Sequence, residues 1–383
     1  MSETITATAK APPSTGTRPR GRILIGGVQQ AGTSLKSFRC ERSRYGRGDT
    51  FSADLALTAG GAIWYDPKED QNGEIADIDV QIQMGFLADG APEGSCAWTT
   101  VFQGIIDTLG PIEPHRAMAS ISGRDYLAKL RDLAVAEAYL NHTATEILQS
   151  LITAAGLTPD VQMPTGLDGA FYQIEHKRLA LIGNHRFSSG FDLARFLVNA
   201  ANCDMWAHGK TVRVRPRGSS TKSTTLTYVP PGALSYAKMP VTNLSLERDL
   251  LIGKGVVVQV STRDVRQRAT HTWYWSAKGA SRTAPSTANA QVYAFSPPGL
   301  TDDAAKAYAQ ARYNEIVAHG RTVAITMPGD LSLGPRQSVQ LVGTGTSWDQ
   351  TYSIDALERS LSMESGFTQT LTLRNRLTEA DAE

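Results

Sequence analysis

Cysteine is scarce in this chain. Its 383 residues include three cysteines, Cys40, Cys96 and Cys203, and no two of them have Cys-x-x-Cys spacing. A domain held together by disulfides and a zinc finger both need paired or clustered cysteines at set spacings. We therefore interpret the three residues as free thiols in a reducing compartment.

The sequence also lacks an excess of charge of either sign and a long apolar run. Lys and Arg number 38 and Asp and Glu number 37, which gives a formal net charge of +1. A near-neutral chain has no overall field that would draw it to nucleic acid or to an anionic membrane. No apolar stretch approaches the roughly 18 residues of a membrane-spanning helix, and no secretory apolar segment follows the start. We expect no membrane span.

Recognisable catalytic motifs are missing too. The seven histidines form no His-x-x-x-His pair, the glycine-rich segments 26–33 and 343–348 lack Gly-Lys-Ser/Thr, and no Gly-x-Ser-x-Gly occurs. These patterns mark metal sites, phosphate-binding loops and serine hydrolases respectively. Acidic pairs fall only in a predicted turn and at a predicted helix start, where solvated carboxylates are usual. The sequence predicts no catalytic residue, no metal ligand and no cofactor.

Two arginines, Arg213 and Arg215, share one face of a predicted strand. Such a basic strip could contact phosphates. No aromatic stacking platform accompanies it, so a partner-facing or solvated strand is the favoured interpretation.

Alternating apolar residues predict β-strands in the first third of the chain. From 78 to 86 the apolar side chains fall at every second position, which is the period of a half-buried strand. They are Ile78, Val80, Ile82, Met84 and Phe86. Together with the β-rich segments around them, this pattern predicts one antiparallel β-domain, a barrel or sandwich, over residues 23–125. The preceding residues 1–22, rich in Thr, Ala, Pro and Ser, are predicted to form a flexible arm.

Helix signals mark residues 126–240 as a small α+β region. Thr143 and Glu146 have the spacing of a capping box, and Gly156 lies where a glycine ends a helix. A further helix is predicted from Ser189, followed by two strands around the turn at 208–210.

Short strands return over residues 241–376. One long helix interrupts them, beginning at Thr301 with two aspartates in its first turn. The tail, residues 377–383, is acidic and is expected to fray. The two outer β-regions have similar content, but no convincing residue-level repeat is evident between them. The predicted fold class is therefore mainly β with an α+β insert.

Seven short motifs follow one another along most of this sequence. They are Val80–Gly85, Phe102–Asp107, Ser122–Asp125, Leu140–Leu148, Ser189–Ala194, Gly209–Val214 and Gly343–Ile354. Each is weak alone, but their order and spacing resemble the late control protein D family, the hub proteins of phage tail baseplates. The resemblance extends from about residue 23 to residue 373.

The resemblance implies a homotrimeric ring. Two tail-tube-like antiparallel β-barrel domains in each chain, each with an associated helix, would give six barrels that join a sixfold tail tube to a threefold spike. The implied partners are the tail tube or distal tail protein, the central spike, the other baseplate (wedge) proteins and the tape-measure protein. DNA would pass through the lumen without specific binding. The implied location is the tail baseplate of a virion assembled in the bacterial host cytoplasm.

The hub core of such proteins has no catalytic residues to carry over. We instead predict that seven residues of the motifs are structurally demanding, at turns and strand edges. These are Gly104, Asp107, Gly123, Arg124, Asp125, Asp349 and Tyr352.

Two other functions stay open at this point. One is a tail-associated peptidoglycan-cleaving enzyme whose catalytic part is the middle region. The other is a glycan-binding adhesin, because Trp273 and Trp275 share one strand face and could stack on sugars. Alternating tryptophans are, however, more often core or interface residues.

Overall fold

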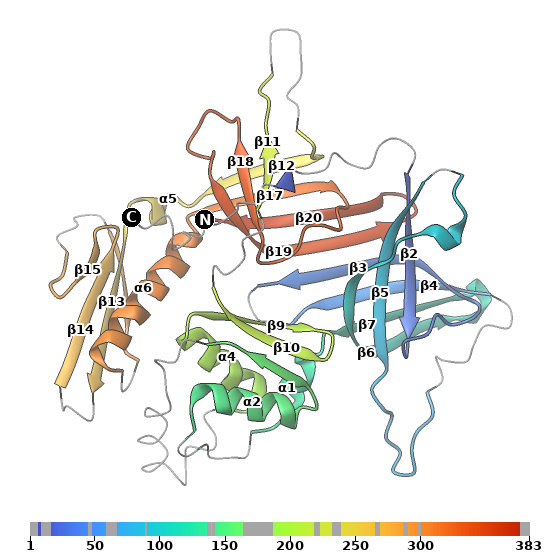
Figure 1. Ribbon diagram of the computed structural model, residues 1–383, viewed down its shortest axis with the longest axis horizontal. Coiled ribbons are helices and arrows are strands. Elements are labelled where there is room, and N and C mark those ends of the chain that lie inside the picture. The colour runs from blue at the N-terminus through green and yellow to red at the C-terminus, as the bar shows by residue number, and fades with distance from the viewer. Residues whose placement is uncertain are drawn as a thin grey trace.

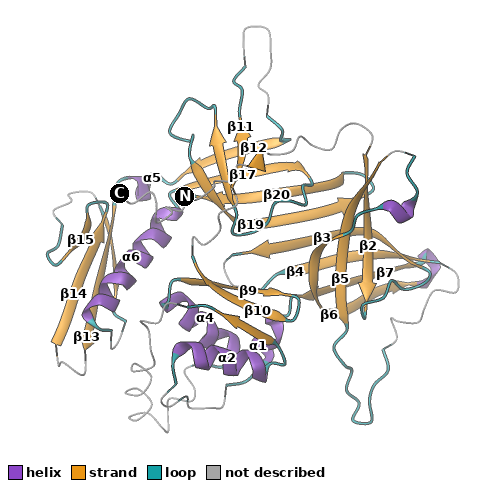
Figure 2. Ribbon diagram, viewed as in Figure 1, coloured by secondary structure: helices purple, strands orange, loops and turns teal. Residues whose placement is uncertain are grey.

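The computed structural model describes most of the chain. The described residues are 7–8, 17–44, 48–58, 67–88, 90–135, 139, 142–163, 187–217, 223–231, 239–264, 269–285, 290–297 and 300–375. Most of the predicted arm and the whole predicted tail lie outside them. Strands dominate, so the predicted mainly β fold with an α+β insert is confirmed (Figures 1 and 2). No helix in the described ranges is long and apolar enough to span a bilayer.

The first strand group contains six antiparallel strands in the order β2-β5-β6-β7-β4-β3. Their bounds are β2 (Thr17–Ile25), β3 (Thr33–Ser43), β4 (Thr50–Leu57), β5 (Asp79–Ala88), β6 (Thr99–Glu113) and β7 (Met118–Arg124). The short helices η1 (Glu93–Ser95) and η2 (Pro114–Arg116) flank β6. The alternating residues of β5 do point into a core, where Val80, Ile82 and Met84 are fully buried. Strand β2 begins at Thr17, so residues 17–22, expected in the arm, belong to the sheet because β5 pairs with them.

The second strand group also contains six strands, in the order β11-β18-β19-β20-β17-β12. Their bounds are β11 (Ser223–Thr227), β12 (Asn243–Arg248), β17 (Arg321–Pro328), β18 (Ser338–Val342), β19 (Thr351–Ser362) and β20 (Gly366–Arg374). The two-residue strand β1 (Ala7–Thr8) pairs with the outer edge of β11. Although β11 falls in the stretch expected to form the middle region, it pairs with β18 of the second group.

The two groups have the same topology. Matching the groups in chain order sets the first group, β2 to β7, against β11, β12, β17, β18, β19 and β20 of the second. Every strand pairing in one group then has its counterpart in the other. The single difference in sense is that β11 runs parallel to β18, whereas β2 runs antiparallel to β5. The fold therefore contains an internal repeat.

The two groups meet edge to edge along β3 and β19. This antiparallel ladder runs from Ala356 opposite Ser43 to Leu361 opposite Phe38. It creates one uninterrupted antiparallel sheet in the order β7-β4-β3-β19-β20-β17-β12, visible as the stack of roughly parallel arrows in Figure 1.

The middle module, with its own apolar core, lies beside this seam (Figure 2). It contains α1 (Leu127–Asp132), α2 (Ala144–Ala154), β8 (Thr158–Val161), α4 (Gly190–Ala200), β9 (Cys203–His208) and β10 (Thr211–Pro216). The predicted capping box is confirmed, since the Thr143 hydroxyl accepts from the Glu146 amide and the Glu146 carboxylate accepts from the Thr143 amide.

A fourth unit is inserted between β12 and β17. It contains α5 (Leu250–Gly253), β13 (Val256–Asp264), β14 (Ala269–Ser276), β15 (Gly279–Ser281), β16 (Gln291–Phe295) and α6 (Asp302–Ala318). Helix α6 packs on β13 and β14 around a separate core, and Figure 1 shows this unit set apart from the strand groups. The stretch 241–376, expected to be one domain, thus holds two cores.

Candidate functional site

Three parts of the molecule are tied together by one buried ion pair. Arg44 Nε lies 2.6 Å from an Asp204 carboxylate oxygen, and both side chains are about 5% exposed. The same guanidinium donates to the Ser353 hydroxyl at 2.6 Å. Arg44 follows β3, Asp204 belongs to β9 and Ser353 to β19, so this one side chain links the first group, the middle module and the second group.

Asp204 also accepts from a second arginine. Arg217 Nε lies 3.2 Å from the other carboxylate oxygen, and its Nη2 donates to Asn199. A third arginine, Arg336, is half-buried with its guanidinium over the Trp206 ring, 4.3 Å from the centroid. Burial lowers the pKa of Arg336 to about 10, so it remains charged near neutral pH. Two arginines therefore pair directly with Asp204, and the charge of the Asp204 carboxylate also favours the charged form of the third.

A pair of aspartates extends this network to the start of α1. Asp49 accepts from Arg42 at 3.1 Å and from the Ser43 amide at 2.9 Å. Asp125 donates its amide to the Asp49 carbonyl, and its carboxylate accepts from the Leu127 amide at 3.2 Å. Burial, and then the nearby Asp49 carboxylate, raise the pKa of Asp125 to about 7.

Five of the seven residues predicted to be structurally demanding lie where the middle of β6 pairs with the end of β7, or directly after it. A β-carbon on Gly104 would collide with the Arg124 carbonyl, and one on Gly123 would collide with the Ile105 carbonyl. Arg124 donates to both oxygens of Asp107, at 2.7 and 2.9 Å. That hydrogen bond to Asp107 is the main reason why the pKa of Arg124 is raised. The close backbone approach and the ion pair both help to fix the pairing of β6 with β7.

The other two predicted residues lie in the second group. Asp349 accepts from the Thr344 amide, the Thr344 hydroxyl and the Gly345 amide at 2.7–2.9 Å. Hydrogen bonding, chiefly from the Thr344 hydroxyl, lowers the pKa of Asp349. Tyr352 is fully buried and donates to the Trp348 carbonyl at 3.1 Å. Both residues thus hold the loop between β18 and β19.

Sequence reasoning missed Arg44, Asp204 and Arg336, because each is a single charged residue without a motif. The one available signal was Asp204, a carboxylate inside the otherwise apolar strand segment Cys203–Ala207. A buried charge is retained only when it is paired, so such an interruption indicates a partner elsewhere in the chain.

The residues considered for other chemistry are engaged in packing or ion pairs. Arg215 donates to Asp160 at 2.6 Å, and Arg213 lies 3.5 Å from the same carboxylate. Trp273 donates to Asp302 at 3.0 Å and is covered by the Arg282 guanidinium at 4.2 Å. Its ring is therefore not an open platform for a sugar. Within the described ranges, no group of three or more His, Cys, Asp or Glu side chains could hold a metal ion.

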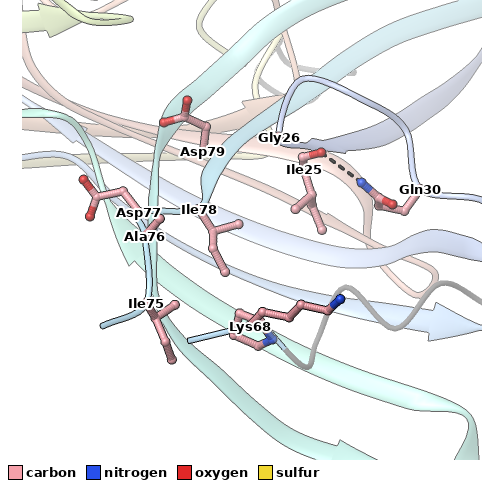
Figure 3. Close-up of a pocket in the computed structure, with 10 residues that line it drawn as sticks. Ile25, Gly26, Gln30, Lys68, Ile75, Ala76, Asp77, Ile78 and Asp79 are labelled. Carbon is pink, nitrogen blue, oxygen red and sulfur yellow. Dashed lines mark hydrogen bonds between the residues drawn. The ribbon is translucent and has the colours of Figure 1, made fainter. Parts of the chain in front are cut away.

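An open hollow of about 380 Å³ lies between the β2–β3 turn and the segment before β5 (Figure 3). Its lining includes Lys68, Asp77 and Asp79. Asp77 pairs with Lys129 at 2.7 Å and Asp79 with Lys210 at 2.8 Å. Both carboxylates therefore connect the first group to the middle module.

Solved structures of phage tail proteins share this fold. A tail protein from Neisseria meningitidis MC58 matches with a TM-score of 0.65 at 13% identity, over 95% of this chain and 99% of that one. The 43 kDa tail protein of prophage MuSo2 from Shewanella oneidensis matches with a TM-score of 0.60 at 13% identity, with the same coverage.

A component of the type VI secretion system of E. coli matches with a TM-score of 0.54 at 10% identity, over 94% of this chain and 77% of that one. It is described as structurally similar to the bacteriophage T4 tail proteins gp27 and gp5. No family model and no curated protein sequence matches the chain. The fold is thus that of phage tail and related injection-system proteins, in agreement with the resemblance found in the motifs.

Proposed function

We propose that the chain is a structural baseplate hub, three copies of which form a ring that joins a sixfold tail tube to a threefold spike. The observation that carries the proposal is the internal repeat. Two strand groups of one topology, joined edge to edge, let three chains offer six similar units to a sixfold partner. Equivalent patches can then bury equivalent surfaces despite the change of symmetry.

The seam between the groups supports a rigid role. The Arg44–Asp204 pair and the Arg44–Ser353 hydrogen bond fix the first group, the middle module and the second group to one another. A ring that keeps two symmetries aligned needs a fixed angle between its two groups.

The face of the seven-stranded sheet that points away from the cores is suited to a channel wall. Hydroxyl side chains are frequent on it: Ser37, Ser52, Ser120, Ser122, Thr322, Thr326, Ser360, Thr368, Thr370 and Thr372. Arg39 on this face pairs with Glu358 at 2.8 Å, across the seam. Hydroxyls and paired charges give little electrostatic hold on phosphates, so DNA could pass without specific binding.

The remaining parts of the proposal follow from the ring. The partners would be the tail tube or distal tail protein, the central spike, the wedge proteins and the tape-measure protein. The protein would be located in the virion baseplate after assembly in the bacterial cytoplasm. The proposed role is structural, without catalysis by this chain.

Light scattering of the purified protein, alone and with its spike protein, tests the proposal. We expect a mass of three times the chain mass of 41.3 kDa, either alone or once the spike is added. A monomer under both conditions would overturn the hub function.

A further inference from the structure

The outer edge of β12 is open in the described part of the chain. Strand β12 pairs with β17 on one side, and no described strand covers its other side. Leu246 in this strand is 38% exposed, and Leu250 and Leu251, which follow it in α5, are more than 60% exposed. Three of the large exposed apolar residues thus lie within six positions of one another, beside an uncovered strand edge.

The counterpart strand in the repeat, β3, is covered. Its outer edge pairs with β19, and Cys40 on it is 1% exposed. Cys40 lies opposite Phe51 of β4, and Leu246 lies opposite Val323 of β17. The two strands therefore occupy the same place in their groups, but only one has a neighbour.

Sequence fragments confirm this match of positions. Glu41-Arg42 in β3 and Glu247-Arg248 in β12 are register-equivalent, because Glu41 lies opposite Thr50 and Glu247 opposite Thr322. Thr50 in turn lies opposite Arg124, and Thr322 opposite Arg374.

The strand that covers β3 has a counterpart with an open edge. In β19, residues 356–361 cover β3, directly after an irregularity at Ile354-Asp355-Ala356. In β6, the same irregularity occurs at Ile106-Asp107-Thr108, and the following residue is leucine in both strands. The β5 ladder ends at Ile105, so the edge of β6 beyond Thr108 faces no described strand.

We propose that β12 of one copy pairs with the edge of β6 that begins at Thr108 in a second copy. The pairing is antiparallel and follows the register of the β3–β19 seam at Thr108 and Leu109, before the second irregularity of β6 between Leu109 and Ile112. In this register Thr108 lies opposite Asp249, just as Ala356 lies opposite Ser43 in the seam. Leu109 likewise lies opposite Arg248, just as Leu357 lies opposite Arg42. The inference rests on the proposed hub function and specifies the surfaces through which its copies associate.

The chemistry of the two edges agrees with this pairing. Leu109 lies on the core side of its strand, packed against the first core, and Leu246 lies on the core side of β12. Joining the edges would bring these leucines onto one face, as Leu357 and Phe38 are at the intrachain seam. Such a contact joins two different patches, so repeating it forms a ring when the rotation closes.

A photo-crosslinking amino acid at Leu246 of the full chain tests the pairing. We expect irradiation to give covalent dimers and trimers on a denaturing gel, with crosslinked peptides that contain residues 106–113. The same probe at Val292, an exposed residue on the edge strand of the inserted unit, should give no such linkage.

A substitution gives an independent readout. Leu246→Asp should lower the fraction of trimer in light scattering at least tenfold, whereas Val292→Asp should leave it unchanged. A trimer whose Leu246 crosslinks map elsewhere would overturn the pairing but leave the hub function standing. A protein that stays monomeric with or without spike, and gives no crosslinks, would overturn both.

Discussion

At the residue scale, the described structure shows what surrounds the positions that we predict to be structurally demanding. A carbonyl from β7 lies against Gly104, and Asp125 is buried next to Asp49. The motifs could not show these neighbours, because they come from chain segments that are distant in sequence.

Gly104→Ala should destabilise the protein by about 2 kcal/mol or more, because the added methyl group meets backbone rather than a flexible side chain. Urea denaturation followed by circular dichroism would measure the loss. Gly94→Ala is the matched control, since its β-carbon would enter open space. Equal stability of the two variants would contradict the close approach.

Asp125 should make stability depend on pH. Its folded pKa of about 7 is raised above the ordinary aspartate value, so the folded protein holds a proton that the unfolded chain releases. Unfolding free energy should therefore fall as pH rises from about 4 to 7 and level off above that. Asp125→Asn should flatten this slope in urea titrations at pH 5 and pH 8. Asp303→Asn, an exposed carboxylate in α6, should leave the slope as it is in the unaltered protein.

At the element scale, the sequence could predict local structure better than strand partners. Alternation marked β5, and the capping box marked α2, because both signals lie within about ten residues. The pairing of β3 with β19 joins residues more than 300 positions apart and leaves no local trace. The sequence analysis placed the inserted unit in one domain with the second group for the same reason. The local sequence of a strand does not show which core the strand will join.

The seam between the groups should be the part of the fold most sensitive to charge removal. Asp204→Asn removes a buried negative charge that pairs with both Arg44 and Arg217, so it should cost about 3–5 kcal/mol in unfolding free energy. Arg39→Met breaks the exposed pair with Glu358 at the same seam and should cost less than about 1 kcal/mol. If chemical denaturation showed similar losses of unfolding free energy for Asp204→Asn and Arg39→Met, the buried pair would not be what holds the seam.

At the scale of the whole molecule, the internal repeat is the main feature that sequence analysis missed. Similar composition of the outer regions suggested an architectural parallel, but only short fragments such as Glu-Arg and Ile-Asp-x-Leu, and a few single residues, recur at equivalent positions. Such short fragments become meaningful only when strand registers align them. Packing demands fix the apolar or polar character of most positions, not their identity, which also accounts for a shared fold at 13% identity.

Electron microscopy of the purified protein, with its spike protein if the ring requires it, tests the central claim most directly. If the two strand groups are equivalent units, end-on class averages should show a ring with a central hole and six similar lobes, and a strong sixfold component in its rotational spectrum. A threefold ring without that component, or a compact particle without a hole, would contradict the account.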